Sequence, residues 1–138
     1  MPFKFERLEV WQLAIKYVDL MYDIGDKLPR AEEFSLKSQM IRAATSVALN
    51  IAEGSTGQTD TEQARFLGLA LRSLLETVAC QKLIARRSYP VNAELLDAAY
   101  RDAEALSAKL HTFRKTIEPN QAWLREEPAD YTTDMTDF

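Results

Sequence analysis

The chain has 138 residues, a length that fits one domain and can bury a substantial core. Hydrophobic residues make up 46% of it, yet no apolar run approaches the ~20 residues of a membrane-spanning helix, so we expect no membrane span. A net charge of −4 gives no support to a protein that coats nucleic acid through its overall charge. The first residues lack the apolar segment of a secretory signal, so we expect a cytoplasmic protein.

Charge is distributed unevenly along the chain. Residues 1–117 carry 16 Lys and Arg against 15 Asp and Glu, whereas residues 118–138 carry Arg125 against six acidic residues. We therefore predict a helical domain over residues 1–117 and an acidic C-terminal tail over residues 118–138. Trp123 and Leu124 favour a short docking segment within this tail, while a solvated extension is the alternative.

Residues 5–27 are predicted to form the first helix. Apolar residues recur at alternating steps of three and four, which is typical of a helix that faces a bundle: Leu8, Trp11, Ile15, Val18 and Tyr22. A second line widens this face: Val10, Ala14, Tyr17, Met21 and Ile24. Leu28 and Pro29 end the helix, because the residue before a proline avoids the α conformation.

Residues 35–54 are predicted to form the central, most enclosed helix. At 100° per residue its apolar residues fall on one line: Met40, Ala44, Val47 and Ile51. A band of polar residues lies nearly opposite: Gln39, Arg42, Ser46, Asn50 and Glu53. We expect Gly54 to end the helix in the left-handed conformation.

Residues 60–87 are predicted to form the third helix, which begins at a capping box made by Thr59 and Glu62. Two adjacent apolar lines run along it and are broadened by Leu69, Leu75 and Leu83. This surface exceeds what one bundle contact needs, so we expect part of it to be buried against another copy of the chain. Deep burial within a monomer is the alternative.

Residues 93–117 are predicted to form the fourth helix, with Asn92 as its N-cap. It carries the most regular apolar repeat of the chain: Leu96, Ala99, Ala103, Leu106, Leu110, Phe113 and Ile117. Four helices of similar length with short connections predict an all-α fold, an antiparallel up-down-up-down four-helix bundle.

The polar band, together with Glu76 of the third helix, is the first candidate site. It could line a groove or the centre of a ring and bind a ligand there. The alternative that we favour is a hydrogen-bonded network between helices or subunits, because Arg, Asn and Glu are common in satisfied buried interfaces. Glu76 would then pair with Arg42 or Lys82 in a structural salt bridge.

A set of cations on the third helix is the second candidate site: Arg65, Arg72, Lys82, Arg86 and Arg87. Repeated around an oligomer, these side chains would form a basic rim able to contact the phosphates of RNA or DNA. The alternative is a solvated helix end, where cations also complement the helix dipole.

The residue patterns of catalytic and cofactor sites are missing. His111 has Ala108 three residues before it, so the Glu-x-x-His pattern of di-iron bundles is not formed. Cys80 lies on an apolar line and is predicted to be a buried thiol, and one cysteine with one histidine leaves no soft metal site. Neither Gly-x-Ser-x-Gly nor a phosphate-binding glycine loop occurs. We therefore expect no enzymatic activity, no metal and no cofactor.

Several sequence blocks follow one another over most of residues 5–89: Phe5 to Gln12, Ser38-Gln39 with Arg42-Ala43-Ala44 and Ser46-Val47, Asn50 to Gly54, and Phe66-Leu67 with Ala70, Ser73-Leu74 and Glu76. In this order they resemble the bacterial four-helix bundle protein family, which includes proteins encoded within intervening sequences of large ribosomal RNA genes. The resemblance implies a left-handed bundle that assembles as a ring of identical subunits, usually a pentamer, with no established catalytic activity. More distant relatives resemble the accessory protein of diversity-generating retroelements, which binds nucleic acid and a reverse transcriptase.

Two functions therefore remain open. The first is a non-enzymatic, homo-oligomeric scaffold, ring-shaped and pentameric, that binds an unidentified protein. The second is an accessory factor that binds RNA or DNA through the basic rim. A monomeric mass would contradict the first function, and absent or salt-insensitive nucleic-acid binding would contradict the second.

Overall fold

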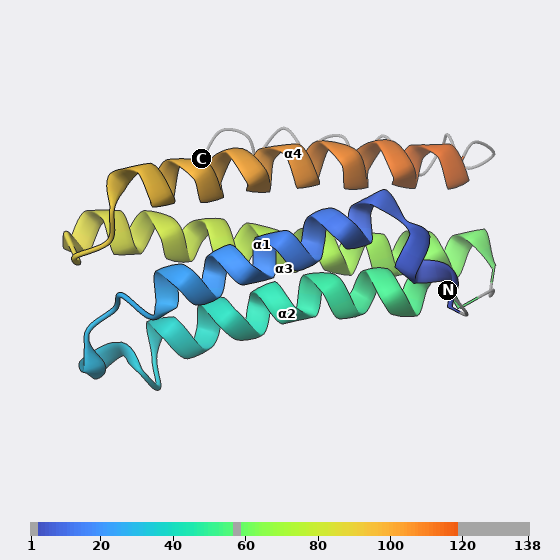
Figure 1. Cartoon of the computed structure of the whole chain (residues 1–138). Helices are drawn as coiled ribbons and strands as arrows, with labels where there is room; N and C mark the ends of the chain where they lie inside the picture. The colour runs from blue at the N-terminus through green and yellow to red at the C-terminus, as the bar shows by residue number, and fades with distance from the viewer. Residues whose placement is uncertain (1–2, 57–58, 119–138) are drawn as a thin grey trace.

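The computed structural model describes residues 3–56 and 59–118, and this part of the chain is all-α. Its four long helices are α1 (Glu9–Gly25), α2 (Leu36–Gly54), α3 (Asp60–Arg87) and α4 (Ala93–Ile117), and two short 3-10 helices are η1 (Lys4–Arg7) and η2 (Arg30–Glu32). Successive long helices run in opposite directions (Figure 1), and α1 and α3 each contact both α2 and α4. The all-α prediction is confirmed, and the contacts are those of an up-down bundle.

The predicted first helix over residues 5–27 is wrong at both ends, because α1 begins only at Glu9 and ends at Gly25. Leu8 has extended backbone angles, φ −72° and ψ 132°, which separate η1 from α1. The Phe5 ring packs edge-on against Trp11 with 4.6 Å between ring centroids, and the Gln12 side chain donates to the Glu6 carbonyl at 3.0 Å. These contacts fold the first residues back onto the start of α1, and the apolar spacing continues across the break.

Both predicted N-caps are confirmed. The Thr59 hydroxyl accepts a hydrogen bond from the Glu62 amide at 3.1 Å, and the Asn92 side chain accepts one from the Glu94 amide at 2.7 Å. Each supplies a partner for an amide at a helix N-terminus that has none within its helix. Ser88, which follows the last residue of α3, takes the left-handed conformation with φ 57°.

Gly54 does not take the left-handed conformation predicted for it, since it is the last helical residue of α2. Its importance lies in helix packing. A Cβ atom added at Gly54 would approach the Phe66 Cβ to 3.0 Å, which is tighter than nine in ten real Cβ contacts. The glycine therefore allows the end of α2 to lie close against the start of α3.

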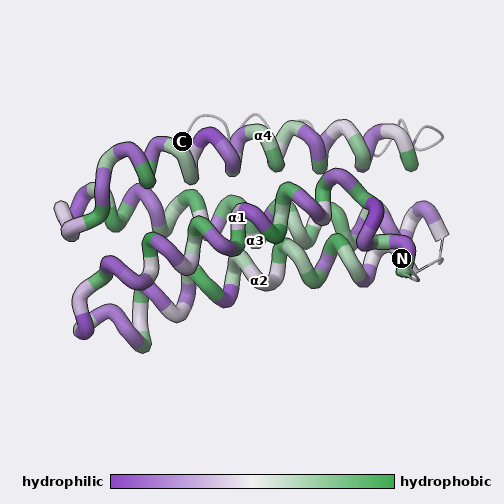
Figure 2. Tube along the Cα trace, viewed as in Figure 1, coloured by the Kyte–Doolittle hydropathy of each residue, from purple (hydrophilic) through white to green (hydrophobic). Residues whose placement is uncertain are grey.

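The core confirms the predicted apolar faces of α2 and α4. Met40, Ala44, Val47 and Ile51 of α2 are buried, and the repeat of α4 either lies in the core or packs against it. In α1 the line predicted only to widen the bundle-facing side is the buried one: Val10, Ala14, Tyr17, Met21 and Ile24. The line predicted to face the bundle, from Leu8 to Val18, is half-buried, and its last member, Tyr22, is exposed. Figure 2 shows hydrophobic and hydrophilic residues alternating along every helix, as expected when each buries one face.

A chain of hydrogen bonds crosses the core between the diagonal helices α1 and α3. Gln81 Nε2 donates to the Tyr17 hydroxyl at 2.5 Å, and the Thr77 hydroxyl donates to the Leu74 carbonyl at 2.6 Å. Because the Thr77 proton is used in this way, Tyr17 is the donor in the 2.7 Å bond between the two hydroxyls. Burial raises the pKa of Tyr17 above its usual value, so the donor stays protonated.

Candidate functional surfaces

The predicted polar band of α2 is divided by the structure into an internal and an external part. Ser46 and Asn50 are half-buried: Asn50 Nδ2 donates to the Ser46 carbonyl at 2.9 Å and to the Ser46 hydroxyl at 3.0 Å. The Ser73 hydroxyl of α3 donates to the same Ser46 hydroxyl at 2.9 Å. This part of the band joins α2 to α3, in line with the network that we favoured.

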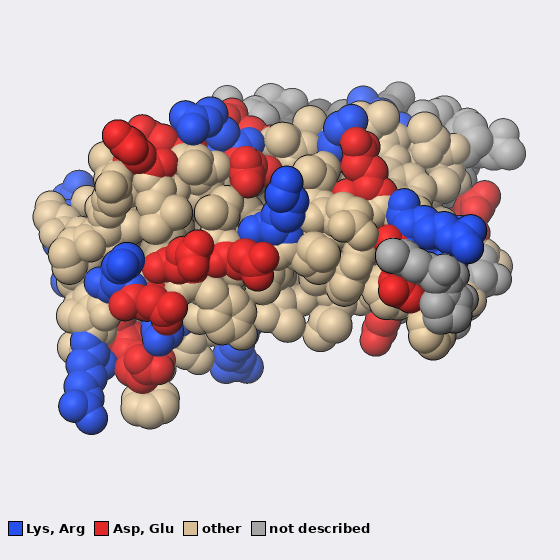
Figure 3. All heavy atoms as spheres, viewed as in Figure 1, with Lys and Arg blue, Asp and Glu red and all other residues tan. Residues whose placement is uncertain are grey.

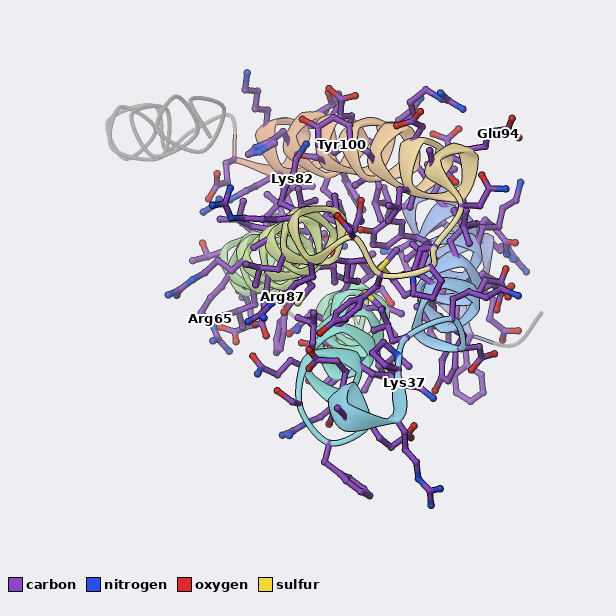
Figure 4. The ribbon with its side chains drawn as sticks, turned by 90° about the vertical axis from the view of Figure 1, so that its left-hand side faces the viewer. Lys37, Arg65, Lys82, Arg87, Glu94 and Tyr100 are labelled. Carbon is purple, nitrogen blue, oxygen red and sulfur yellow. The ribbon has the colours of Figure 1, made fainter. Side chains whose placement is uncertain are left out.

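The rest of the band faces outward. Gln39, Arg42 and Glu53 are exposed, as is Glu76 on α3. Within residues 3–56 and 59–118, Glu76 forms no salt bridge to Arg42 or Lys82. Lys82 instead places its ammonium over the Tyr100 ring, 4.3 Å from the centroid, and Figure 4 shows the two residues together where α3 meets α4.

A groove runs along the outer side of α2, and we call it the α2 groove. Its lining combines apolar side chains with polar and charged ones: Tyr22, Ile41, Arg42, Thr45, Ser46, Leu49, Asn50 and Glu53. Leu49 is 57% exposed and Tyr22 is 48% exposed, although both are large apolar side chains. An apolar strip bordered by one cation and one anion is typical of a protein-protein contact surface.

The five cations predicted for a basic rim are not equivalent. The Arg65 guanidinium donates to the Glu62 carboxylate at 2.8 Å and lies over the Phe66 ring. The Lys82 ammonium lies over the Tyr100 ring. Arg72, Arg86 and Arg87 are exposed, and Arg86 and Arg87 line a small depression with Leu83 at the end of α3. Figure 3 shows positive and negative side chains interspersed on the face it presents.

The surplus apolar surface predicted for α3 is smaller than expected. Leu83 is 51% exposed, but Leu69 and Leu75 are half-buried within the chain. The other large exposed apolar side chains of the described residues lie outside α3: Phe3, Tyr22, Phe34, Leu49 and Tyr100. The sequence prediction missed this distribution because Leu49 lies on the side of α2 away from its regular apolar line.

Two loops at one end of the bundle are joined by a hydrogen bond that the sequence prediction also missed. The Tyr89 hydroxyl, between α3 and α4, donates to Glu32 Oε2 at 2.5 Å, and the Leu36 amide donates to Glu32 Oε1 at 3.3 Å. The bond from Tyr89, and then that from Leu36, hold the pKa of the Glu32 carboxyl below its usual value. The same bond raises the pKa of Tyr89.

Cys80 is a buried thiol, as predicted, and its burial raises its pKa to about 11, with a smaller contribution from Glu76. Such a thiol is protonated near neutral pH and is a poor nucleophile. Burial, together with Arg114 and Lys115, lowers the pKa of His111. Among the residues that the structure describes, no three His, Cys, Asp or Glu side chains are grouped so that they could hold a metal ion.

The four antiparallel helices place the chain in the class of small all-α bundle proteins. None of the described helices combines the length and the apolarity that a bilayer crossing requires. A family model described as 23S rRNA-intervening sequence protein matches residues 6–112, and the chain belongs to that family. The family recognised from the sequence blocks is thereby confirmed.

A solved structure gives independent support for the fold. It is that of a protein of unknown function from the S23 ribosomal protein family of Bacteroides thetaiotaomicron, with a TM-score of 0.70 and 22% sequence identity. The match covers 77% of this chain and 98% of that chain. A search among curated proteins finds no match. At this level of identity the solved structure is similar in fold, and function has to be argued from the surfaces described above.

Proposed function

We propose that the protein is a non-enzymatic scaffold of the cytoplasm that assembles with copies of itself into a ring, as a pentamer of left-handed bundles. The assembled ring would present its outer surface to a protein partner. The observation that carries the proposal is the α2 groove, where Leu49 and Tyr22 are exposed between Arg42 and Glu53. An assembled chain would remove this apolar surface from water, which is the main source of favourable free energy in association.

The mass of the full chain in solution tests this proposal. Sedimentation or native mass spectrometry is expected to give about five times the chain mass of 15.7 kDa. Leu49→Asp, which places a charge in the α2 groove, is expected to shift the mass towards that of a single chain. Leu83→Asp is the matched control, since Leu83 has similar exposure but lies on α3 outside the groove. A wild-type chain that stays monomeric at high concentration would contradict the proposal.

A second candidate function is binding of RNA or DNA by a basic rim. It is supported by Arg72, Arg86 and Arg87, which are exposed on one helix and form no ion pair within the described residues. Copies of these arginines in a ring would multiply the phosphate contacts. Affinity capture from a native lysate, followed by identification of the nucleic acid and protein that co-elute, separates the two functions. A discrete RNA lost on charge reversal of Arg86 and Arg87 would favour this candidate.

A further inference from the structure

Phe34 is the most exposed of the large apolar side chains in the described part of the chain. It is 95% exposed and lies between η2 and α2, in the loop at one end of the bundle. Single exposed apolar residues are common on protein surfaces, but a nearly fully exposed phenylalanine is costly in water. Aromatic side chains of this kind are typical anchors of protein-protein contacts.

The segment that carries Phe34 is fixed on both sides. On the N-terminal side Glu32 accepts hydrogen bonds from the Tyr89 hydroxyl and the Leu36 amide. On the C-terminal side Lys37 Nζ lies 3.3 Å from Glu33 and 3.7 Å from Asp26, so its ammonium joins the loop to the end of α1. Figure 4 looks at this end of the bundle, with Lys37 labelled beside the loop. The ring is therefore presented by an ordered backbone, which lowers the entropy lost on binding.

The α2 groove has the features that a phenylalanine ring requires. Leu49, Tyr22 and Ile41 provide an apolar lining, and the Tyr22 ring can pair with a second aromatic ring. Phe34 cannot enter the groove of its own chain at Leu49, because α2 rises by ~1.5 Å per residue and the two residues are separated by ~20 Å. A second copy of the chain can bring the two surfaces together.

We propose that Phe34 of one copy binds in the α2 groove of the next copy. The charges agree with this occupant: Arg30, which is exposed four residues before Phe34, carries the charge opposite to that of Glu53 at the border of the groove. The two contacting surfaces differ, so the contact is heterologous, and repetition of such a contact closes a ring when the rotation allows it. This inference rests on the proposed function and names the contact that would build the assembly.

The inference is tested by mixing two defective full-length chains. Phe34→Ser removes the ring but keeps the groove, and Leu49→Asp spoils the groove but keeps the ring. Each variant alone is expected to sediment as a monomer at a concentration where the wild-type chain is fully assembled. An equimolar mixture has one intact pair of surfaces, so its mass is expected to double to a dimer and to grow no further.

Leu83→Asp is the matched control and is expected to keep the wild-type mass, and circular dichroism checks that every variant stays helical. An assembled Phe34→Ser variant, or a mixture that remains monomeric, would overturn the contact while leaving the proposed scaffold intact. A wild-type chain that is itself monomeric would overturn both. Recovery of the dimer only in the mixture would establish that the contact joins two different surfaces.

Discussion

Tyr17 joins the diagonal helices α1 and α3 through its hydroxyl group. It accepts from Gln81 and donates to Thr77, and all three side chains are buried. Gln81 Oε1 has no hydrogen-bond partner among the described residues. The network is therefore satisfied along one path only, and loss of a member leaves further buried polar atoms unpaired.

Tyr17→Phe is expected to lower the free energy of unfolding by about 1–3 kcal/mol, because Gln81 Nε2 then retains only a 3.9 Å contact with Met21 Sδ. Urea denaturation at fixed protein concentration measures the loss. Tyr100→Phe is the control, since it removes a hydroxyl from an exposed tyrosine and is expected to change stability by less than ~0.5 kcal/mol. Equal stability of both variants would show that the hydrogen bonds of the Tyr17 hydroxyl make no net contribution to the free energy of unfolding.

At the residue scale, Glu32 makes the stability of the folded protein depend on pH. The bond from Tyr89 lowers the pKa of its carboxyl, so the stability it provides is complete above the unfolded-state pKa of about 4.5. That stability is lost as the pH falls through the lower folded-state pKa. The melting temperature of wild type should therefore exceed that of Glu32→Gln near pH 6, and the difference should shrink on acidification from about pH 5.

Glu104→Gln is the control for this pH series, because Glu104 is an exposed carboxylate of α4. It is expected to follow the wild-type melting curve at every pH. A difference between wild type and Glu32→Gln that stays constant from pH 6 to pH 3 would contradict the assigned role of the carboxylate.

At the scale of whole elements, Gly54 and Gly68 distinguish close helix packing from ordinary contact. A Cβ at Gly54 would meet the Phe66 Cβ at 3.0 Å, and that atom is attached to the α3 backbone and cannot rotate away. A Cβ at Gly68 would meet the Arg114 guanidinium at 3.4 Å, which is an ordinary contact with a flexible side chain. An alanine at Gly54 therefore requires a helix backbone to shift, whereas an alanine at Gly68 requires at most a movement of the Arg114 side chain.

Gly54→Ala is expected to destabilise the protein by about 1–3 kcal/mol relative to Gly68→Ala, since overpacking outweighs the gain in helix propensity at the first site. Gly68→Ala is expected to be neutral or stabilising by up to ~1 kcal/mol. Thermal unfolding of both variants at the same concentration makes the comparison. A stabilised Gly54→Ala would mean that α2 and α3 can separate there without cost.

The helices could be predicted from sequence because their signals are local. Cap residues and apolar periodicity are read within a few positions, which is why Thr59, Asn92 and the buried line of α2 agree with the structure. The break at Leu8 and the close approach at Gly54 depend on contacts with Trp11 and Phe66 that periodicity does not encode. Local patterns therefore predicted elements better than their exact ends.

The candidate surfaces were harder to predict, because they depend on how side chains from several helices meet. The polar band was found by its spacing, but its division into a network with Ser73 and an exposed part required the position of α3. Gln81 lies four residues after Thr77 and seven after Leu74, so its place on the buried face could have been read from the sequence. The bond from Tyr89 to Glu32 joins distant loops and had no such signal.

At the scale of the whole molecule, the proposed assembly and the candidate nucleic-acid binding would be linked by charge. One chain presents Arg72, Arg86 and Arg87 as exposed cations of α3, and each phosphate contact with a single strand adds about 0.7 to the magnitude of the slope of log affinity against log salt. A monomer that uses these three cations can reach a slope of about −2 at most. A ring that engages several subunits should exceed this value.

If the basic rim binds RNA, the wild-type chain should therefore show a steeper salt dependence than Leu49→Asp, the variant expected to be monomeric. Filter binding of a single-stranded RNA across a series of salt concentrations measures both slopes. Arg86→Glu combined with Arg87→Glu should reduce the slope without changing the sedimentation mass, whereas Lys16→Glu on α1 should change neither. Equal slopes for wild type and Leu49→Asp would show that each subunit acts alone, and absent binding would leave the arginines as a solvated helix end and the scaffold as the remaining function.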